Sequence, residues 1–145
     1  MSEESSANPP RSFYVIGIAA LVWNLLGVMQ YVMRVTMSES AIAELPADQQ
    51  AFINEIPVWA NSAFAIATNA GALGCLLLLL RKSWAYPVLV ISLLGVLVQD
   101  FHGFFVADGL AAYGGFGVVM TALVLAISAF LVWYAMNARE KGWIS

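Results

Sequence analysis

Four long apolar runs constrain this sequence more than any other feature. Each run has about 20 residues, the length that an α-helix needs to cross the roughly 30 Å hydrocarbon core of a bilayer. Lipid leaves the backbone no external hydrogen-bond partner, so such runs favour helices over strands or loops. The sequence therefore predicts an all-α integral membrane four-helix bundle, with spans at about 13–35, 57–80, 86–106 and 116–136.

The composition supports the same class. Hydrophobic residues make up 61% of the chain and charged residues 10%, whereas soluble domains are typically about 25% charged. The formal net charge is only -3 and no basic stripe is present, which argues against a nucleic-acid partner. The lipid bilayer is the expected environment.

The spans form one expected domain, residues 13–138, between two short tails. Residues 1–12 are polar, acidic and rich in proline, so we expect a disordered cytoplasmic tail. A cleaved signal peptide is disfavoured, because its apolar core would have only about 7 to 15 residues and a basic leader. Residues 139–145 are expected to form a second short cytoplasmic tail.

The segment 36–56 differs from the spans because it mixes acidic and apolar residues. Its apolar positions fall on one face of a helix, and Pro46 suits the first turn of that helix. We expect an amphipathic helical segment between the first two spans. Two interpretations stay open: a cover over the helix ends at the membrane surface, or an ordinary connecting helix. The apolar face consists of Leu45, Phe52, Ile53 and Ile56.

The basic residues predict the orientation of the chain. All but one of the six lie on the side shared by the two termini and the short turn 81–84, and Arg34 alone lies on the other side. Basic residues concentrate on the cytoplasmic side of membrane proteins, so both termini are expected to be cytoplasmic. The short turn also predicts that the second and third spans are antiparallel neighbours.

Six polar residues are predicted to share one depth near the outer membrane surface. At a rise of about 1.5 Å per residue, Asp100 lies about 21 Å and Arg34 about 31 Å above the inner edge of the hydrocarbon core. An Arg34–Asp100 ion pair would offset the cost of both charges, and His102 is expected to bond Gln99 or to titrate. The cluster is interpreted either as a structural salt-bridge layer or as a substrate or proton site. Its members are Gln30, Arg34, Asn61, Gln99, Asp100 and His102.

Catalytic and metal-binding motifs are not found. The sequence contains no GxSxG, P-loop or HExxH pattern, one histidine, and one cysteine, Cys75, within an apolar run. We therefore expect no enzyme activity, no cofactor and no metal. Small residues at Ala63, Ala67 and Gly71 are expected to let helix backbones approach closely.

Two segments resemble a known family. Residues 13–31 (FYVIGIAALVWNLLGVMQY) and 71–87 (GALGCLLLLLRKSWAYP) resemble small four-span bacterial proteins often labelled "sugar transporter". The resemblance implies a multi-pass protein of the bacterial inner (plasma) membrane. It favours an oligomeric carrier for a small solute such as a sugar. The alternative is a non-catalytic accessory or scaffold subunit of a larger membrane complex. The first span has no acidic residue, unlike that of small multidrug exporters.

Overall fold

The computed structural model describes residues 8–145, apart from the side chains of residues 109 and 110. Residues 1–7 of the predicted tail lie outside the described residues. The described regular structure is entirely helical, which confirms the all-α prediction. The helices are α2 (Arg11–Val35), α3 (Glu39–Ala43), α4 (Ala47–Asn54), α5 (Val58–Leu79), α6 (Ala85–Phe101) and α7 (Gly109–Glu140), and a π-helical turn, η1 (His102–Val106), follows α6.

Four of these segments are long and apolar enough to cross a membrane: α2, α5, α6 with η1, and α7. The α7 helix begins earlier and ends later than the apolar run 116–136. Gly114 interrupts α7, with φ 65° and ψ -155°, a conformation that residues with a side chain rarely adopt. The helical turn before Gly114 lies between the predicted spans 86–106 and 116–136.

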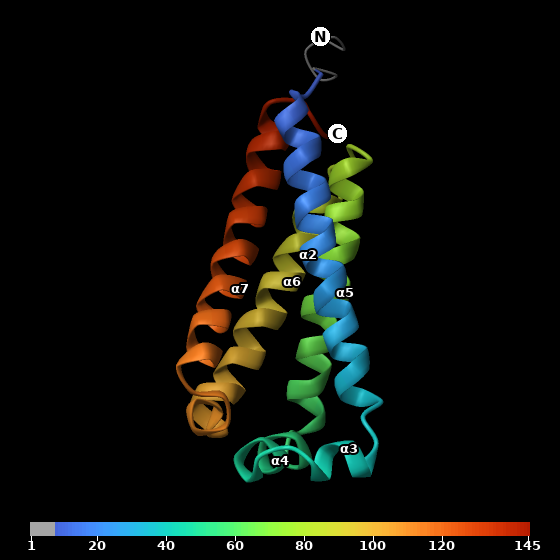
Figure 1. The fold of residues 1–145 in the computed structure, drawn as a ribbon. Coiled ribbons are helices and arrows are strands. Elements are labelled where there is room, and N and C mark those ends of the chain that lie inside the picture. The colour runs from blue at the N-terminus through green and yellow to red at the C-terminus, as the bar shows by residue number, and fades with distance from the viewer. Residues whose placement is uncertain (1–7) are drawn as a thin grey trace.

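The four long helices run along the length of the molecule (Figure 1). The beginning of α2 and the end of α7 lie at one end, and α3 and α4 lie at the other. Extensive packing joins α2 to α5, α5 to α6, and α6 to α7. The helices α2 and α7 do not pack extensively against each other, which leaves room for a cavity between them.

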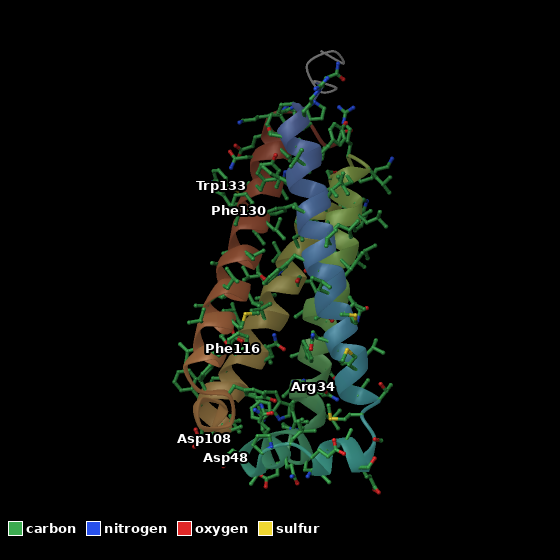
Figure 2. The ribbon with its side chains drawn as sticks, in the orientation of Figure 1. Arg34, Asp48, Asp108, Phe116, Phe130 and Trp133 are labelled. Carbon is green, nitrogen blue, oxygen red and sulfur yellow. The ribbon has the colours of Figure 1, made fainter. Side chains whose placement is uncertain are left out.

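The segment between α2 and α5 forms two short helices, α3 and α4, and Pro46 directly precedes α4. The hydroxyl of Ser38 caps α3 by accepting a hydrogen bond from the backbone of Ala41 at 3.2 Å. The Gln50 amide joins the two helices by donating to the backbone carbonyls of Ala43 at 3.1 Å and Leu45 at 2.7 Å. Both helices lie across the ends of the long helices, and α4 packs against α7 (Figures 1 and 2).

Close backbone approach joins α5 and α6, as the short turn and the small residues predict. The side-chain hydroxyl of Ser92 on α6 donates to the carbonyl of Ala67 on α5 at 2.6 Å. A Cβ atom added to Gly95 would lie 2.9 Å from the carbonyl oxygen of Ala63. Ala63, Ala67 and Gly71 are all buried, so the small residues of α5 provide packing surface.

The segment after α7 packs against the turn between α5 and α6 and is not a free tail. Ile144 is only 2% exposed. The backbone of Ser145 donates to the carbonyl of Arg81 at 3.1 Å and accepts from the backbone of Ser83 at 3.1 Å. Arg81 also donates from Nε to the carbonyl of Trp143 at 2.8 Å. These contacts hold the last residues of the expected short tail 139–145 against the rest of the molecule.

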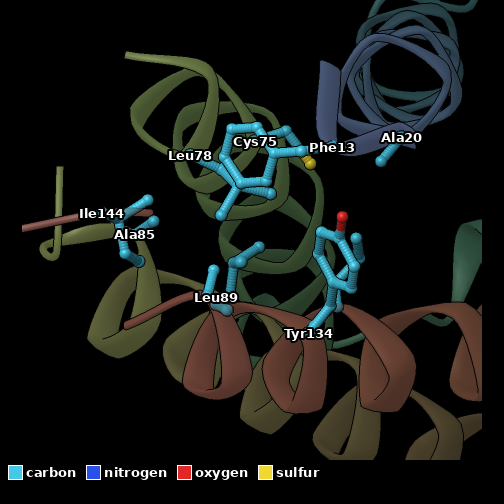
Figure 3. Close-up of a cluster of buried hydrophobic side chains, with 11 residues drawn as sticks. Phe13, Ala20, Cys75, Leu78, Ala85, Leu89, Tyr134 and Ile144 are labelled. Carbon is cyan, nitrogen blue, oxygen red and sulfur yellow. The ribbon is translucent and has the colours of Figure 1, made fainter. Parts of the chain in front are cut away.

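A hydrophobic core occupies this end of the molecule (Figure 3). Phe13 from α2 is fully buried and stacks on Tyr134 from α7, with ring centroids 6.1 Å apart. Leu78 from α5 and Leu89 from α6 complete the contact between the four long helices. The helices are therefore tightly joined at the end where α2 begins and α7 ends.

Candidate functional site

Arg34 lies near the end of α2, on the side of α3 and α4 (Figure 2). Its Nη2 donates a hydrogen bond to Oδ1 of Asn61 at 3.1 Å. Its guanidinium carbon lies 4.2 Å from the centre of the Phe64 ring, a cation–π contact. Asn61 and Phe64 both belong to α5, so α5 sets the position of the Arg34 side chain.

The predicted ion pair between Arg34 and Asp100 does not form. Asp100 lies on α6, and its Oδ2 atom is shielded from solvent without a hydrogen-bond partner among the described residues. The Nε atom of Arg34 is likewise shielded from solvent and has no hydrogen-bond partner among the described residues. The reason is the order in which the helices pack. α5 contacts both α2 and α6, and side chains of α5 are the partners of Arg34.

Arg34 and Asp100 nevertheless line one cavity of about 260 Å³. We call it the polar cavity. Gln99 and Asp100 line it from α6, and His102 lines it from η1. The side-chain amide of Gln99 makes no hydrogen bond within the described part of the chain. Aromatic and small residues complete its wall, and the lining is Arg34, Phe52, Ile56, Ala60, Gln99, Asp100, His102, Gly103, Phe104, Tyr113, Phe116, Gly117, Met120 and Thr121.

His102 is surrounded by aromatic rings rather than by polar partners. It is 3% exposed, and its ring makes edge-on contacts with Phe52 at 5.7 Å and Trp59 at 5.4 Å between centroids. The expected bond to Gln99 is not present. His102 begins the π-helical turn, and its carbonyl accepts from the backbone of Ala107 at 2.7 Å. Such turns are frequent at functional sites.

A second cavity, of about 520 Å³, opens at the end where α3 and α4 lie, and we call it the end cavity. Three carboxylate residues line it, from α4, the residue after α4, and the start of α7. It shares Phe52 and His102 with the polar cavity, so these two rings separate the two spaces. The three acidic residues are Asp48, Glu55 and Asp108.

A third cavity, of about 510 Å³, lies between α2 and α7 and is bordered by α5 and α6. We call it the central cavity. It shares Gln99, Phe116 and Met120 with the polar cavity, so the two spaces adjoin. The remaining lining combines aromatic and apolar residues with amides and hydroxyls: Trp23, Asn24, Leu26, Gly27, Gln30, Phe64, Ala67, Thr68, Val96, Val124 and Ser128.

The six residues predicted to form one layer are thus brought together only in part. Arg34, Gln99, Asp100 and His102 line the polar cavity. Gln30 is exposed and lines the central cavity instead. Asn61 lines none of the three cavities and acts by holding Arg34.

Sequence reasoning missed the aromatic residues that line and divide the cavities. Phe52 was expected only on an apolar face, although it contacts His102 and Tyr113. Tyr113 and Phe116 flank Gly114, where α7 is interrupted. The Gly114-Gly115 pair is a sequence signal that could have predicted this interruption, because glycine pairs mark turns.

The fold and the cavities define a class: a multi-pass, all-α chain with four candidate membrane spans and an internal polar site. No known family, curated protein or solved structure matches this chain.

Proposed function

We propose that the protein is a membrane carrier for a small polar solute, which enters at the α3–α4 end and binds in the polar and central cavities. One observation carries the proposal. The end, polar and central cavities adjoin through shared lining residues, whereas the opposite end is filled by a hydrophobic core. A site open to one side and closed to the other is what a carrier needs in one of its two conformations.

The distribution of basic residues gives the proposed direction of opening. Arg81, Lys82 and Arg139 lie at the closed end, on the side expected to be cytoplasmic. The end cavity and its acidic residues then face the exterior. We propose the bacterial inner membrane as the location, because residues 13–31 and 71–87 resemble small four-span bacterial proteins.

The central cavity supplies chemistry suited to a polar solute within the membrane. Amide groups of Gln30 and Gln99 and the hydroxyl of Ser128 line the same space as the indole of Trp23. A few polar groups set in a mostly apolar wall are typical of small-molecule sites. Sugars are among the solutes to test, because residues 13–31 and 71–87 resemble small bacterial proteins labelled "sugar transporter".

A homo-oligomer is part of the proposal. Two walls of the central cavity, α2 and α7, do not pack extensively against each other. Four helices also form a thin wall around any solute pathway. A second copy packed along α2 and α7 would complete that wall within the bilayer.

Purified protein in liposomes tests the proposal directly. We expect uptake and counterflow of at least one solute from a panel of sugars, amino acids and polyols. Gln99→Ala removes an amide that lines both the polar and the central cavity. It should reduce transport about 5-fold, the effect of losing one hydrogen bond of about 1 kcal/mol. Leu123→Ala, at an exposed position of α7, is the matched control.

Transport of no solute by folded, reconstituted protein would reject the carrier. Co-purification of the protein in a defined larger complex, with no transport of its own, would instead support the accessory or scaffold subunit.

A further inference from the structure

We infer that the polar cavity binds a small zwitterion, with the anionic group of the ligand on Arg34 and the cationic group on Asp100. The inference names the class of solute that the proposed carrier would transport, and it rests on the proposed function for transport itself. It comes from two opposite charges that line one cavity without meeting each other.

Neither charge has an opposite charge as its partner among residues 8–145. Arg34 has a hydrogen bond to the neutral amide of Asn61 and a contact with the ring of Phe64, but its Nε atom has no partner in the described structure. Asp100 has an equally unpartnered Oδ2 atom. Charged groups away from water are strongly destabilised unless an opposite charge or hydrogen bonds compensate them. Two residues of opposite charge thus line the polar cavity, and neither has an ion-pair partner among the described residues.

The two charges are held on separate helices. Arg34 is directed towards α5 by Asn61, and Asp100 belongs to α6. A neutral ligand would leave both charges uncompensated, and a singly charged ligand would leave one. Only a ligand with both signs of charge compensates the two groups at once. A guanidinium is well suited to bind a carboxylate or phosphate, and a carboxylate to bind an ammonium.

The size and wall of the cavity limit the ligand further. A volume of about 260 Å³ is below the roughly 300–1,000 Å³ typical of pockets for drug-sized molecules. The rings of Phe52, Tyr113 and Phe116 line the same space, and aromatic faces attract ammonium groups. Neutral α-amino acids and betaines meet both conditions.

Two sources can supply this chemistry. A free zwitterion reaches the polar cavity from the end cavity, past Phe52 and His102. The headgroup of a zwitterionic phospholipid reaches it from the central cavity, which lies between α2 and α7, past Gln99 and Met120. The charge pattern is the same in both cases, so the lipid composition of the assay must separate them.

The test uses the full chain in nanodiscs of phosphatidylglycerol, which contain no zwitterionic lipid. Calorimetry compares neutral amino acids and glycine betaine with singly charged analogues, for example L-valine with isovalerate and isobutylamine, and with glucose. We expect at least one zwitterion to bind ten or more times tighter than both of its analogues and glucose. Addition of phosphatidylethanolamine identifies the source: competition with the free zwitterion indicates that the headgroup also enters the site.

Variants test the two assigned roles through selectivity, which does not depend on the yield of folded protein. Asp100→Asn should abolish the preference for L-valine over isovalerate, and Arg34→Gln the preference over isobutylamine. Leu123→Ala should keep both preferences. If lipid alone occupies the site, phosphatidylethanolamine should raise the melting temperature of the wild type but not that of Asp100→Asn.

The inference is overturned if no zwitterion, free or lipid-borne, is preferred, or if both variants keep the wild-type selectivity. Its failure is distinguishable from that of the carrier proposal. Transport of a sugar without zwitterion binding would reject only the zwitterion site, and zwitterion binding without transport would reject only the carrier.

Discussion

Nη2 of Arg34 and Oδ1 of Asn61 lie 3.1 Å apart and connect the end of α2 to the beginning of α5. The Phe64 ring, one helical turn after Asn61, lies under the guanidinium at 4.2 Å. Together these two contacts direct Arg34 to α5 and keep it from pairing with Asp100. The charge separation in the polar cavity therefore depends on these two contacts with α5.

The first prediction concerns this contact. Asn61→Ala should lower the free energy of unfolding by about 1–3 kcal/mol, because it removes a hydrogen bond to a charged group. Combined with Arg34→Gln, it should deviate from additivity by more than about 0.5 kcal/mol, since the two side chains touch. Thermal or denaturant unfolding in detergent measures both effects. An additive Arg34 and Asn61 pair, or a larger coupling between Arg34 and Asp100, would contradict this arrangement.

A second prediction compares two glycines on the same span. Gly95→Ala places a Cβ atom 2.9 Å from both the Ala63 carbonyl oxygen and the Ala67 backbone nitrogen. Backbone must move to accept it, so we expect a loss of about 1–3 kcal/mol in unfolding free energy. Gly103→Ala meets no atom within 4 Å and should change stability by less than about 1 kcal/mol. Equal effects at the two positions would show that α5 and α6 are not packed this closely.

The third prediction concerns the closed end. Phe13 is fully buried against Tyr134 and Trp143, so Phe13→Ala should cost about 3–5 kcal/mol of unfolding free energy. Val15 on the same helix is 66% exposed, and Val15→Ala is the control, with an expected change of less than about 0.5 kcal/mol. Thermal unfolding of the purified variants measures the difference. A Phe13→Ala variant as stable as the control would place this residue outside the core.

The fourth prediction tests the orientation in the membrane. Asp48 and Glu140 are exposed acidic residues at opposite ends of the long helices. In whole cells, an impermeant thiol reagent should label Asp48→Cys and not Glu140→Cys, because the basic residues predict a cytoplasmic position for the end of α7. Cys75 is buried and should contribute little background. Labelling of Glu140→Cys alone would reverse the orientation and place the end cavity in the cytoplasm.

The sequence by itself determined the helical class and the approximate position of each long helix. A run of about 20 apolar residues is most stable as a helix in lipid, because only the helix satisfies its own backbone groups. It also determined that α5 and α6 are neighbours, since the turn between them is too short for any other arrangement. The sequence also identified Ala63 and Ala67 as packing residues, because close approach of two helix backbones requires small side chains.

Only the tertiary structure decided which polar groups meet. Counting residues along a helix gives the height of a side chain but not the neighbour towards which it is rotated. Arg34 and Asp100 were therefore placed at similar depth, yet Asn61 on the intervening α5 became the partner of Arg34. His102 packs against Phe52 from α4, a contact between residues 50 positions apart that no local pattern encodes. Helix rotation and packing order are set by all four helices together, and they created a cavity with two unpaired charges.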